Sequence, residues 1–294
     1  MTAVTDTRRA GGPDDAVGGV VPREVVRPTT VDQVAEVLTA AAADGRTVVL
    51  ADGTVAHAGG KVVKNVAGYD LGKLFTGAHG TLGVVVSTTW RLHPVPPARR
   101  VVTLELPDAA AAGPVSVALA RSTLTPSALE LIAGADGTAR LVVLFESIAE
   151  SVAGQARAAV ALLGGGEESE DLPEDFGRRP GGADDVLLRL AHAPASLSAV
   201  LGALPAGTAL AAHAATGVTY AAVPAGEAVD ALPRLRAAIA PHDGTAVVLR
   251  APDAVRERLD HWGPVGDSLD LMRRVKERFD PERRMSPGRF VGGL

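Results

Sequence analysis

Residues 59–93 read GGKVVKNVAGYDLGKLFTGAHGTLGVVVSTTWRLH, and this stretch decides which fold the chain adopts. Its first 25 residues hold seven glycines, more than a helix or a strand requires. Glycine is favoured where φ is positive or where the backbone must approach another group closely. From Val84 to His93 the side chains alternate as they do in a β-strand, and Pro94 ends the pattern. The stretch therefore predicts a glycine-rich loop that leads into a long strand.

The residues before this loop predict a helix and a strand. Thr30 and Gln33 form a capping-box pattern, apolar residues follow at helical spacing, and Gly45 stands where a helix often ends. We therefore expect a helix over residues 30–44. Residues 47–50 then read as a short strand.

The middle of the chain repeats a rhythm of strand, helix, hairpin and helix twice. Ser147 and Glu150 form a second capping-box pattern, and the acidic residues 167–175 between the copies are expected to face solvent. Two such units that share one sheet would form a ferredoxin-like α+β domain. The predicted strands are residues 101–106, 128–132, 140–145, 186–190, 209–213, 218–223 and 245–250, and the predicted helices are residues 109–122, 147–164, 195–204 and 228–239.

The C-terminal residues predict one more helix and an irregular tail. Apolar side chains recur at helical spacing from Leu269 to Phe279, and Pro281 ends the helix. Residues 283–290 are basic and show no periodicity.

The composition excludes several classes of protein. The chain has 294 residues, of which 47% are hydrophobic, and this excludes an extensively disordered protein. It has no cysteine, which excludes disulfides, thiolate-bound zinc and iron–sulfur ligation by this chain. A net charge of -5 argues against a nucleic-acid partner. The histidines share no ligand spacing with carboxylates, so no metal site is expected.

No segment reads as a signal peptide or as a membrane span. Residues 1–19 lack the apolar core of a signal peptide and are expected to be disordered. The most apolar stretch, residues 199–225, is rich in alanine and glycine and is interrupted by Pro205, His213 and Pro224. It therefore predicts buried strands rather than a transmembrane segment. The chain also lacks a Walker loop and a nucleophile elbow, so the hydrolase and nucleoside-triphosphatase classes have no support.

Three stretches of the chain resemble the vanillyl-alcohol-oxidase-type FAD proteins. Residues 59–84 are similar to their flavin loop, and residues 279–281 and 287–290 are similar to their C-terminal motif. Residues 27–30, with the helix that follows, resemble the start of their FAD-binding domain. The run VKNVAGYD at residues 63–70 most resembles the family of glycolate oxidase E subunits. The resemblance covers almost the whole chain.

The resemblance implies an α+β fold with a truncated PCMH-type FAD-binding domain and a ferredoxin-like cap domain. The truncation is a departure from the family, in which a glycine-rich pyrophosphate loop and a further small subdomain follow the strand at residues 47–50. Here the strand passes directly into a turn, where Asp52 would repel phosphate. The implied organisation is a disordered tail over residues 1–22, a truncated FAD-binding domain over 23–98, a cap domain over 99–250, and a C-terminal helix and tail over 251–294 that return to the FAD-binding domain.

The same resemblance indicates where an FAD cofactor would be held. Backbone amides that no Cβ obstructs can approach a flat isoalloxazine ring or a pyrophosphate. The alternative is that these glycines only form a tight loop at the start of a strand, and that Arg289 belongs to an exposed basic tail or neutralises a substrate carboxylate. The expected cofactor-binding residues are Asn65, Gly68, Tyr69, Gly77, Gly80, Thr81, Leu82, Gly83, Val84 and Arg289.

Among the histidines, His213 is the one whose position suggests a role in chemistry. It lies at the tip of a predicted hairpin in the cap domain, where it could act as the base for a 2-hydroxy acid. The alternative is an ordinary turn residue, so the catalytic base is left unassigned.

The resemblance implies an FAD-dependent oxidoreductase subunit that oxidises glycolate or a similar 2-hydroxy acid. Because this chain has no cysteine, electrons would leave through flavoprotein and iron–sulfur partner subunits of a glycolate oxidase-like complex. The implied location is the cytoplasm, or the inner membrane periphery through those partners. Two alternatives stay open: a non-catalytic remnant or assembly subunit that does not bind FAD on its own, and a deletion product whose exposed sheet edges favour aggregation.

Overall fold

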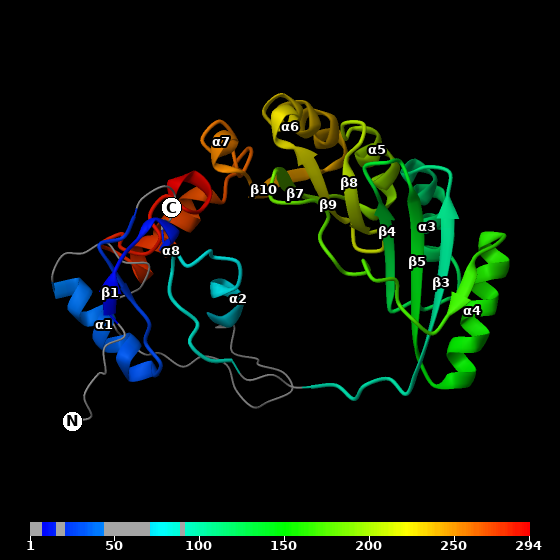
Figure 1. Ribbon diagram of the computed structural model, residues 1–294, viewed down its shortest axis with the longest axis horizontal. Helices are drawn as coiled ribbons and strands as arrows, with labels where there is room; N and C mark the ends of the chain where they lie inside the picture. The colour runs from blue at the N-terminus through cyan, green and yellow to red at the C-terminus, as the bar shows by residue number, and fades with distance from the viewer. Residues whose placement is uncertain (1–7, 16–20, 44–70, 89–91) are drawn as a thin grey trace. The chain divides into compact units, whose positions relative to one another are not determined.

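The computed structural model describes residues 8–15, 21–43, 71–88 and 92–294 (Figure 1). The chain divides into two compact units, one made of residues 1–91 and 265–294 and the other of residues 92–264. The strand predicted at residues 47–50 and the first part of the glycine-rich stretch lie outside the described residues. No helix in the described ranges combines the length and the apolar character that a bilayer crossing requires.

The first unit contains short strands and three helices among its described residues. β1 pairs antiparallel with β2, with Arg9 opposite Val25, so residues 8–15 have regular structure where the sequence predicts a disordered tail. The elements are β1 (Arg8–Ala10), β2 (Glu24–Val26), α1 (Val31–Ala43), α2 (Leu71–Phe75) and α8 (Leu269–Phe279).

The two helices predicted in this unit are confirmed. α1 begins after Thr30, whose side chain accepts a hydrogen bond from the Gln33 amide at 3.2 Å, and the Gln33 side chain accepts one from the Thr29 amide at 2.7 Å. α8 ends at Phe279, immediately before the Asp280-Pro281 pair.

The long strand predicted over residues 84–93 is wrong for the residues that are described. Residues 84–88 and 92–97 belong to no strand, and the side chains of Val84, Val85 and Val86 are 41–59% exposed. A strand is stable only when neighbouring strands accept and donate its backbone hydrogen bonds. Alternating side chains therefore indicate a segment that could form a strand, but the segment becomes a strand only where a neighbouring strand lies beside it.

The second unit is one eight-stranded antiparallel sheet made of two ferredoxin-like halves. The strand order is β10-β7-β9-β8-β4-β5-β3-β6, and β4 joins the halves by pairing with β8. The first half consists of β3 (Ala98–Leu106), α3 (Ala112–Ala120), β4 (Ala128–Ala133), β5 (Ala139–Ser147), α4 (Ala149–Leu163) and β6 (Glu167–Ser169). The second consists of β7 (Asp185–Ala191), α5 (Leu197–Gly202), β8 (Ala209–His213), β9 (Val218–Pro224), α6 (Ala225–Ile239) and β10 (Thr245–Arg250), and α7 (Asp253–Arg256) follows. The ferredoxin-like prediction is confirmed.

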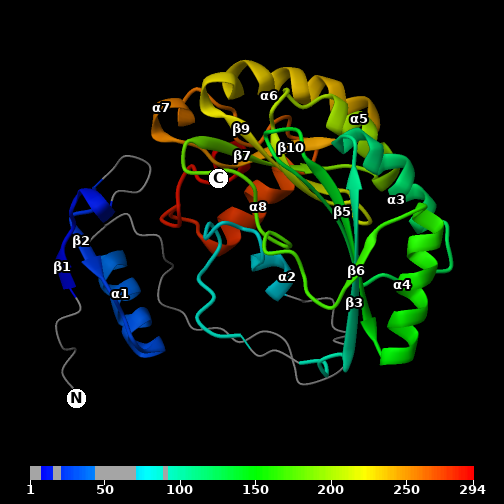
Figure 2. The same cartoon turned by 45° about the vertical axis from the view of Figure 1, so that its right-hand side comes forward.

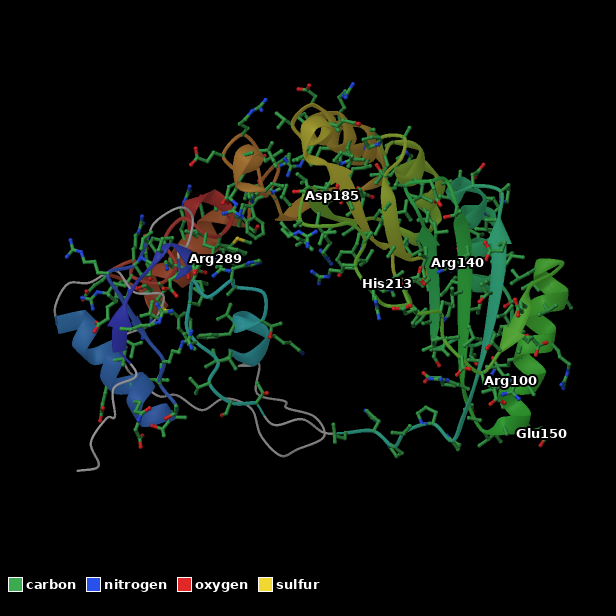
Figure 3. All side chains as sticks on the ribbon, viewed as in Figure 1. Arg100, Arg140, Glu150, Asp185, His213 and Arg289 are labelled. Atoms are coloured by element: carbon green, nitrogen blue, oxygen red, sulfur yellow. The ribbon has the colours of Figure 1, made fainter. Side chains whose placement is uncertain are left out.

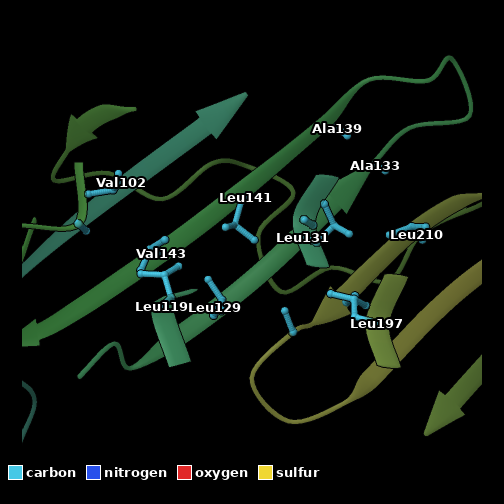
Figure 4. Packing of buried hydrophobic residues seen from close by; sticks show 14 of the residues in the cluster. Val102, Leu119, Leu129, Leu131, Ala133, Ala139, Leu141, Val143, Leu197 and Leu210 are labelled. Atoms are coloured by element: carbon cyan, nitrogen blue, oxygen red, sulfur yellow. The ribbon is translucent and has the colours of Figure 1, made fainter. Parts of the chain in front are cut away.

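Helices α3, α4, α5 and α6 cover one face of this sheet (Figures 1 and 2). Alternate residues of each strand point into the layer between sheet and helices, as Leu129 and Leu131 do on β4 and Leu141 and Val143 do on β5 (Figure 4). A second cluster fills the same layer beneath α6. One local prediction fails here: the residue before α4 is Ile148, which has no side-chain cap, so Ser147 does not form the expected capping box.

A connecting segment, residues 170–182, crosses the sheet face that carries no helix. It must do so because β6 lies at one edge of the sheet and β7 is next to the other edge. Leu172 and Phe176 pack on Val101, Val142 and Leu144, which point away from the helices. The acidic loop predicted over residues 167–175 faces solvent with its carboxylates, since Glu167, Glu168, Glu170, Asp171 and Glu174 are exposed, while its apolar Leu172 packs on the sheet.

Candidate functional site

The site begins with a tight loop, residues 76–83, that follows α2. Gly77, His79 and Gly80 have φ values of 82°, 54° and 76°, a left-handed region that glycine adopts without strain. Thr81 closes the turn, because its amide and its hydroxyl both donate to the Ala78 carbonyl, at 3.0 and 2.7 Å. The glycines at 77 and 80 are therefore required by the shape of the loop.

The C-terminal segment, residues 276–290, packs against this loop. Phe75 and Phe279 meet edge to face with their ring centroids 5.4 Å apart, and His79 stacks on Phe290 at 5.7 Å. A Cβ added to Gly80 would lie 3.3 Å from the Ser286 hydroxyl oxygen. The two stretches quoted for their family resemblance, which are about 200 residues apart in the sequence, are thus one structural feature of the first unit.

A buried ion pair joins the loop to the segment. The ammonium group of Lys276 donates to the Asp280 carboxylate at 2.6 Å, to the Thr81 carbonyl at 2.7 Å and to the Met285 carbonyl at 2.9 Å. The Asp280 carboxylate also accepts from the amides of Met285 and Arg284, at 2.8 and 3.0 Å. Burial raises the pKa of Asp280, but these hydrogen bonds and the nearby ammonium outweigh it and hold that pKa below its ordinary value.

The loop presents polar groups that no described residue uses. Within the described ranges, the amides of Gly80, Leu82 and Gly83 donate no hydrogen bond, and the buried hydroxyl of Ser286 has no partner. Burial and the positive charge of Arg289 together lower the pKa of the adjacent His79. These donors suit a planar ligand with acceptor atoms, so they fit the ring half of a flavin.

Gly83 must be a glycine because of the ring next to it. A Cβ at this position would lie 2.2 Å from Cε1 of Phe75, which Phe279 holds in place. We expect Gly83→Ala to reduce the free energy of unfolding of this unit by about 1–3 kcal/mol, the usual cost of overpacking. Hydrogen exchange of peptides 71–83 measures the effect. Gly154→Ala, on α4 with no atom within 4 Å of the new Cβ, is the control and should not destabilise the protein.

The structure describes seven of the ten residues predicted to contact the cofactor. The loop residues among them and Arg289 lie in the first unit, where loop and C-terminal segment meet, and Arg289 is exposed (Figure 3). Asn65, Gly68 and Tyr69 lie outside the described residues. The sequence reasoning missed Lys276, Asp280 and Ser286 as parts of the site. The available signal was that Lys276 follows Met272 by four residues on the apolar side of α8.

The second unit has its own polar cluster on the sheet face that carries no helix. Glu130 of β4 is 1% exposed and lies directly opposite His213 of β8 in the sheet. Its carboxylate accepts the Gly177 amide from the connecting segment, at 3.1 and 3.3 Å. His213 meets the Tyr220 ring edge to face at 5.9 Å, and the Arg179 guanidinium lies 4.7 Å above the same ring.

A pocket adjoins this cluster. It has a volume of about 220 Å³, and its lining includes Arg140, Arg179 and the ion-paired Asp175. His213 is placed at the end of β8, next to the turn over residues 214–217, so the predicted position at a hairpin is confirmed. A catalytic role for His213 stays one of the two alternatives that the sequence leaves open.

Burial raises the pKa of Glu130, and this has a consequence for stability. A carboxylate whose pKa is higher in the folded state makes the protein less stable as the pH rises above its ordinary value of 4.5. We expect Glu130→Gln to be more stable than the wild type by about 1 kcal/mol near neutral pH, and the difference to vanish in acid. Urea unfolding between about pH 5 and pH 8 measures this. Glu150→Gln, on the exposed start of α4, should leave the pH dependence unchanged.

Comparison with known proteins finds similarity to FAD-linked oxidases and to dehydrogenases of 2-hydroxy acids. The family "FAD linked oxidases, C-terminal domain" matches residues 259–290. The glycolate oxidase subunit GlcD of Bacillus subtilis is 36% identical over 88 residues, which cover 30% of this chain and 19% of that protein. A D-lactate dehydrogenase of Archaeoglobus fulgidus is 34% identical over 119 residues, covering 35% and 27%. A D-2-hydroxyglutarate dehydrogenase of Xanthomonas citri is 42% identical over 64 residues, covering 22% and 14%.

The fold has a counterpart among solved structures. A chitooligosaccharide oxidase superposes with a TM-score of 0.51 at 14% identity, covering 81% of this chain and 64% of that chain. The matched regions of the first two sequence relatives amount to between a fifth and about a quarter of their lengths. The matched C-terminal segment includes the buried Lys276 and Asp280. The chain is thus similar, in its C-terminal segment, to the FAD-linked oxidases.

Proposed function

We propose that the chain is the FAD-binding subunit of a multi-subunit dehydrogenase that oxidises glycolate or a similar 2-hydroxy acid. The observation that carries this proposal is the meeting of the glycine loop with the C-terminal segment, which leaves the amides of Leu82 and Gly83 and the Ser286 hydroxyl without protein partners in the described ranges. The relatives named above act, by their names, on glycolate, D-lactate and D-2-hydroxyglutarate.

The residues of this chain would hold the ring half of the cofactor. Gly80, Leu82 and Gly83 would supply amide donors, Ser286 a hydroxyl, and Arg289 a positive charge beside them. FAD, when bound, would supply the acceptor for the hydride that leaves the carbon bearing the hydroxyl group. The residue that takes the hydroxyl proton is left unassigned, and His213 is the candidate that the sequence offers.

We propose further that tight FAD binding depends on partner subunits. The described residues offer amides for a ring, while the sequence lacks the glycine-rich pyrophosphate loop of the family. Each charged hydrogen bond lost from such a loop is worth about 1.5–3 kcal/mol. Flavoprotein and iron–sulfur subunits of the complex would supply the missing phosphate contacts and the path for electrons. The chain would then lie in the cytoplasm or at the periphery of the inner membrane.

The test compares the full chain alone with the chain co-expressed with such partners. We expect weak flavin binding by the chain alone, and a yellow complex that reduces an electron-accepting dye when given glycolate. Gly80→Val should abolish the flavin absorbance of the complex, because it places a branched side chain at a positive φ against Ser286. Gly137→Val, also at a positive φ but with open space around it, is the matched control.

The second candidate is a non-catalytic assembly subunit. The observation that favours it is the absence of a strand over residues 84–88, where the FAD-binding domain was expected to continue. If the Gly80→Val complex keeps its flavin and its turnover with glycolate, the flavin is held elsewhere and this second function is correct. Testing D-lactate and D-2-hydroxyglutarate in the same assay identifies the substrate.

A further inference from the structure

Lys276 is a buried cation, among the described residues of the first unit, that the proposed function does not yet use. Its side chain is 4% exposed, and all three protons of its ammonium group are taken, by Asp280, Thr81 and Met285. Two of these acceptors lie in the C-terminal segment to which Lys276 itself belongs. The third, the Thr81 carbonyl, belongs to the glycine loop, so this bond is the direct polar link from the ammonium to the loop.

This link fixes the direction of one particular amide. The described chain contains no cis peptide bond, and in a planar trans peptide the carbonyl and the following N–H point in opposite directions. Because the Thr81 carbonyl points at the Lys276 ammonium, the Leu82 N–H points away from it. That N–H donates to no described residue, so it remains available to a ligand.

The sequence around this peptide makes such a link necessary. Gly80 and Gly83 flank the peptide between Thr81 and Leu82, and glycine permits backbone rotations that other residues resist. The ammonium is itself held in place, because Asp280 is fixed by the amides of Met285 and Arg284. The fixed Lys276 ammonium therefore restrains the peptide between Thr81 and Leu82, which could otherwise rotate.

We propose that Lys276 is a positioning residue that keeps the Leu82 N–H turned toward the flavin ring. This inference rests on the proposed function, since it assumes that the ring binds at the loop. Lys276 does not touch the ring in this account. It acts through the Thr81 carbonyl, and its loss would leave the peptide between Thr81 and Leu82 free to turn its donor away.

Selective isotope labelling tests the proposal at the peptide itself. Carbon-13 in threonine carbonyls and nitrogen-15 in leucine amides give one NMR signal for each Thr-Leu peptide, and the chain contains three: 81–82, 103–104 and 123–124. The last two lie in the second unit and serve as internal controls. The full chain is compared with Lys276→Met and with Arg273→Met, which removes an exposed cation from the same helix.

Two results are expected. Without FAD, Lys276→Met should shift the Thr81 carbonyl signal in the direction of a lost hydrogen bond, while the two control signals stay in place. With FAD, the Leu82 amide signal should move in the wild type and in Arg273→Met but not in Lys276→Met, whose dissociation constant for FAD should be about tenfold higher. Lys276→Gln keeps a neutral donor and should recover part of both effects; it also serves if Lys276→Met does not fold.

Three outcomes would overturn the inference. The first is an unchanged Thr81 carbonyl signal in Lys276→Met and Lys276→Gln, which would show that the ammonium does not hold this peptide. The second is an equal FAD response of the Leu82 amide in the wild type and in Lys276→Met. The third is the absence of any FAD response in the wild type while the Thr81 signal still depends on Lys276. This last pattern would refute the proposed flavin site and leave only the structural link.

Discussion

Replacing Asp280 by alanine should destabilise the first unit by about 3–5 kcal/mol, because it leaves a buried charge without its partner. Asp280 is 6% exposed and accepts three hydrogen bonds, one from the Lys276 ammonium and two from the amides of Met285 and Arg284. Its removal leaves two buried amides unsatisfied as well as the ammonium. The exchange rates of peptides 276–290 and 77–88 should rise together, since Lys276 links the two segments.

The matched control for this change is Asp270→Ala on the same helix. Asp270 pairs with Arg273 at 3.0 Å, but its side chain is 85% exposed, and such surface pairs contribute about 0–1 kcal/mol. The pKa of Asp280 is lowered in the folded protein, so its contribution to stability is present above the ordinary pKa and is lost as the pH falls through the lowered value. Equal stabilities of the two variants at neutral pH would show that the ion pair does not hold the C-terminal segment to the loop.

The sequence-based hypothesis that His213 is the general base predicts that replacing it by asparagine lowers the turnover number of the assembled dehydrogenase by about 100-fold or more, the usual effect of losing a general base. Asparagine can still form hydrogen bonds, but it cannot accept the hydroxyl proton. His213 lies opposite Glu130 and beside Tyr220, and asparagine at the strand end should keep the fold. Steady-state kinetics with glycolate, together with the pH profile of the turnover number, measures the effect.

The control for His213 is His242→Asn, which changes an exposed histidine after α6. Its turnover should equal that of the wild type. If His213→Asn also turns over normally, His213 is an ordinary residue at a strand end and the base lies elsewhere. A change in the Michaelis constant alone would instead indicate that His213 binds the substrate without moving a proton.

The parts of the fold that sequence alone predicted are those whose stability is decided by a repeated local pattern. β4, β5, β8 and β9 are short, mostly apolar runs that follow one another in pairs between predicted helices, so both ferredoxin-like halves could be predicted. The capping box at Thr30 and the apolar stripe along α8 predicted their helices correctly for the same reason. The strand predicted over residues 84–93 failed because its formation depends on partners that the pattern does not contain.

Only some of the site residues could be predicted from the sequence, because the burial of a side chain depends on the fold. The glycines at 77, 80 and 83 could be singled out, since their number exceeds what regular structure needs. Lys276 carried only the signal of its place on the apolar side of α8, and Glu130 carried none, because a charged residue in a helix or a strand is most often solvated. Only the fold shows that each is enclosed, the first between loop and tail and the second beneath the segment at Gly177.

The two borders of the large sheet have a consequence for how the protein behaves at high concentration. One border is β6, three residues long, with Glu167 and Glu168 exposed. The other is β10, whose pairing is broken by a bulge between Val248 and Arg250, and where the Val248 amide is already bonded to His261. Short, charged or irregular borders are poor templates for a passing strand. The edges of the sheet are thus protected from pairing with the edges of other copies. The second unit should therefore not aggregate through its sheet, even when partner subunits are scarce.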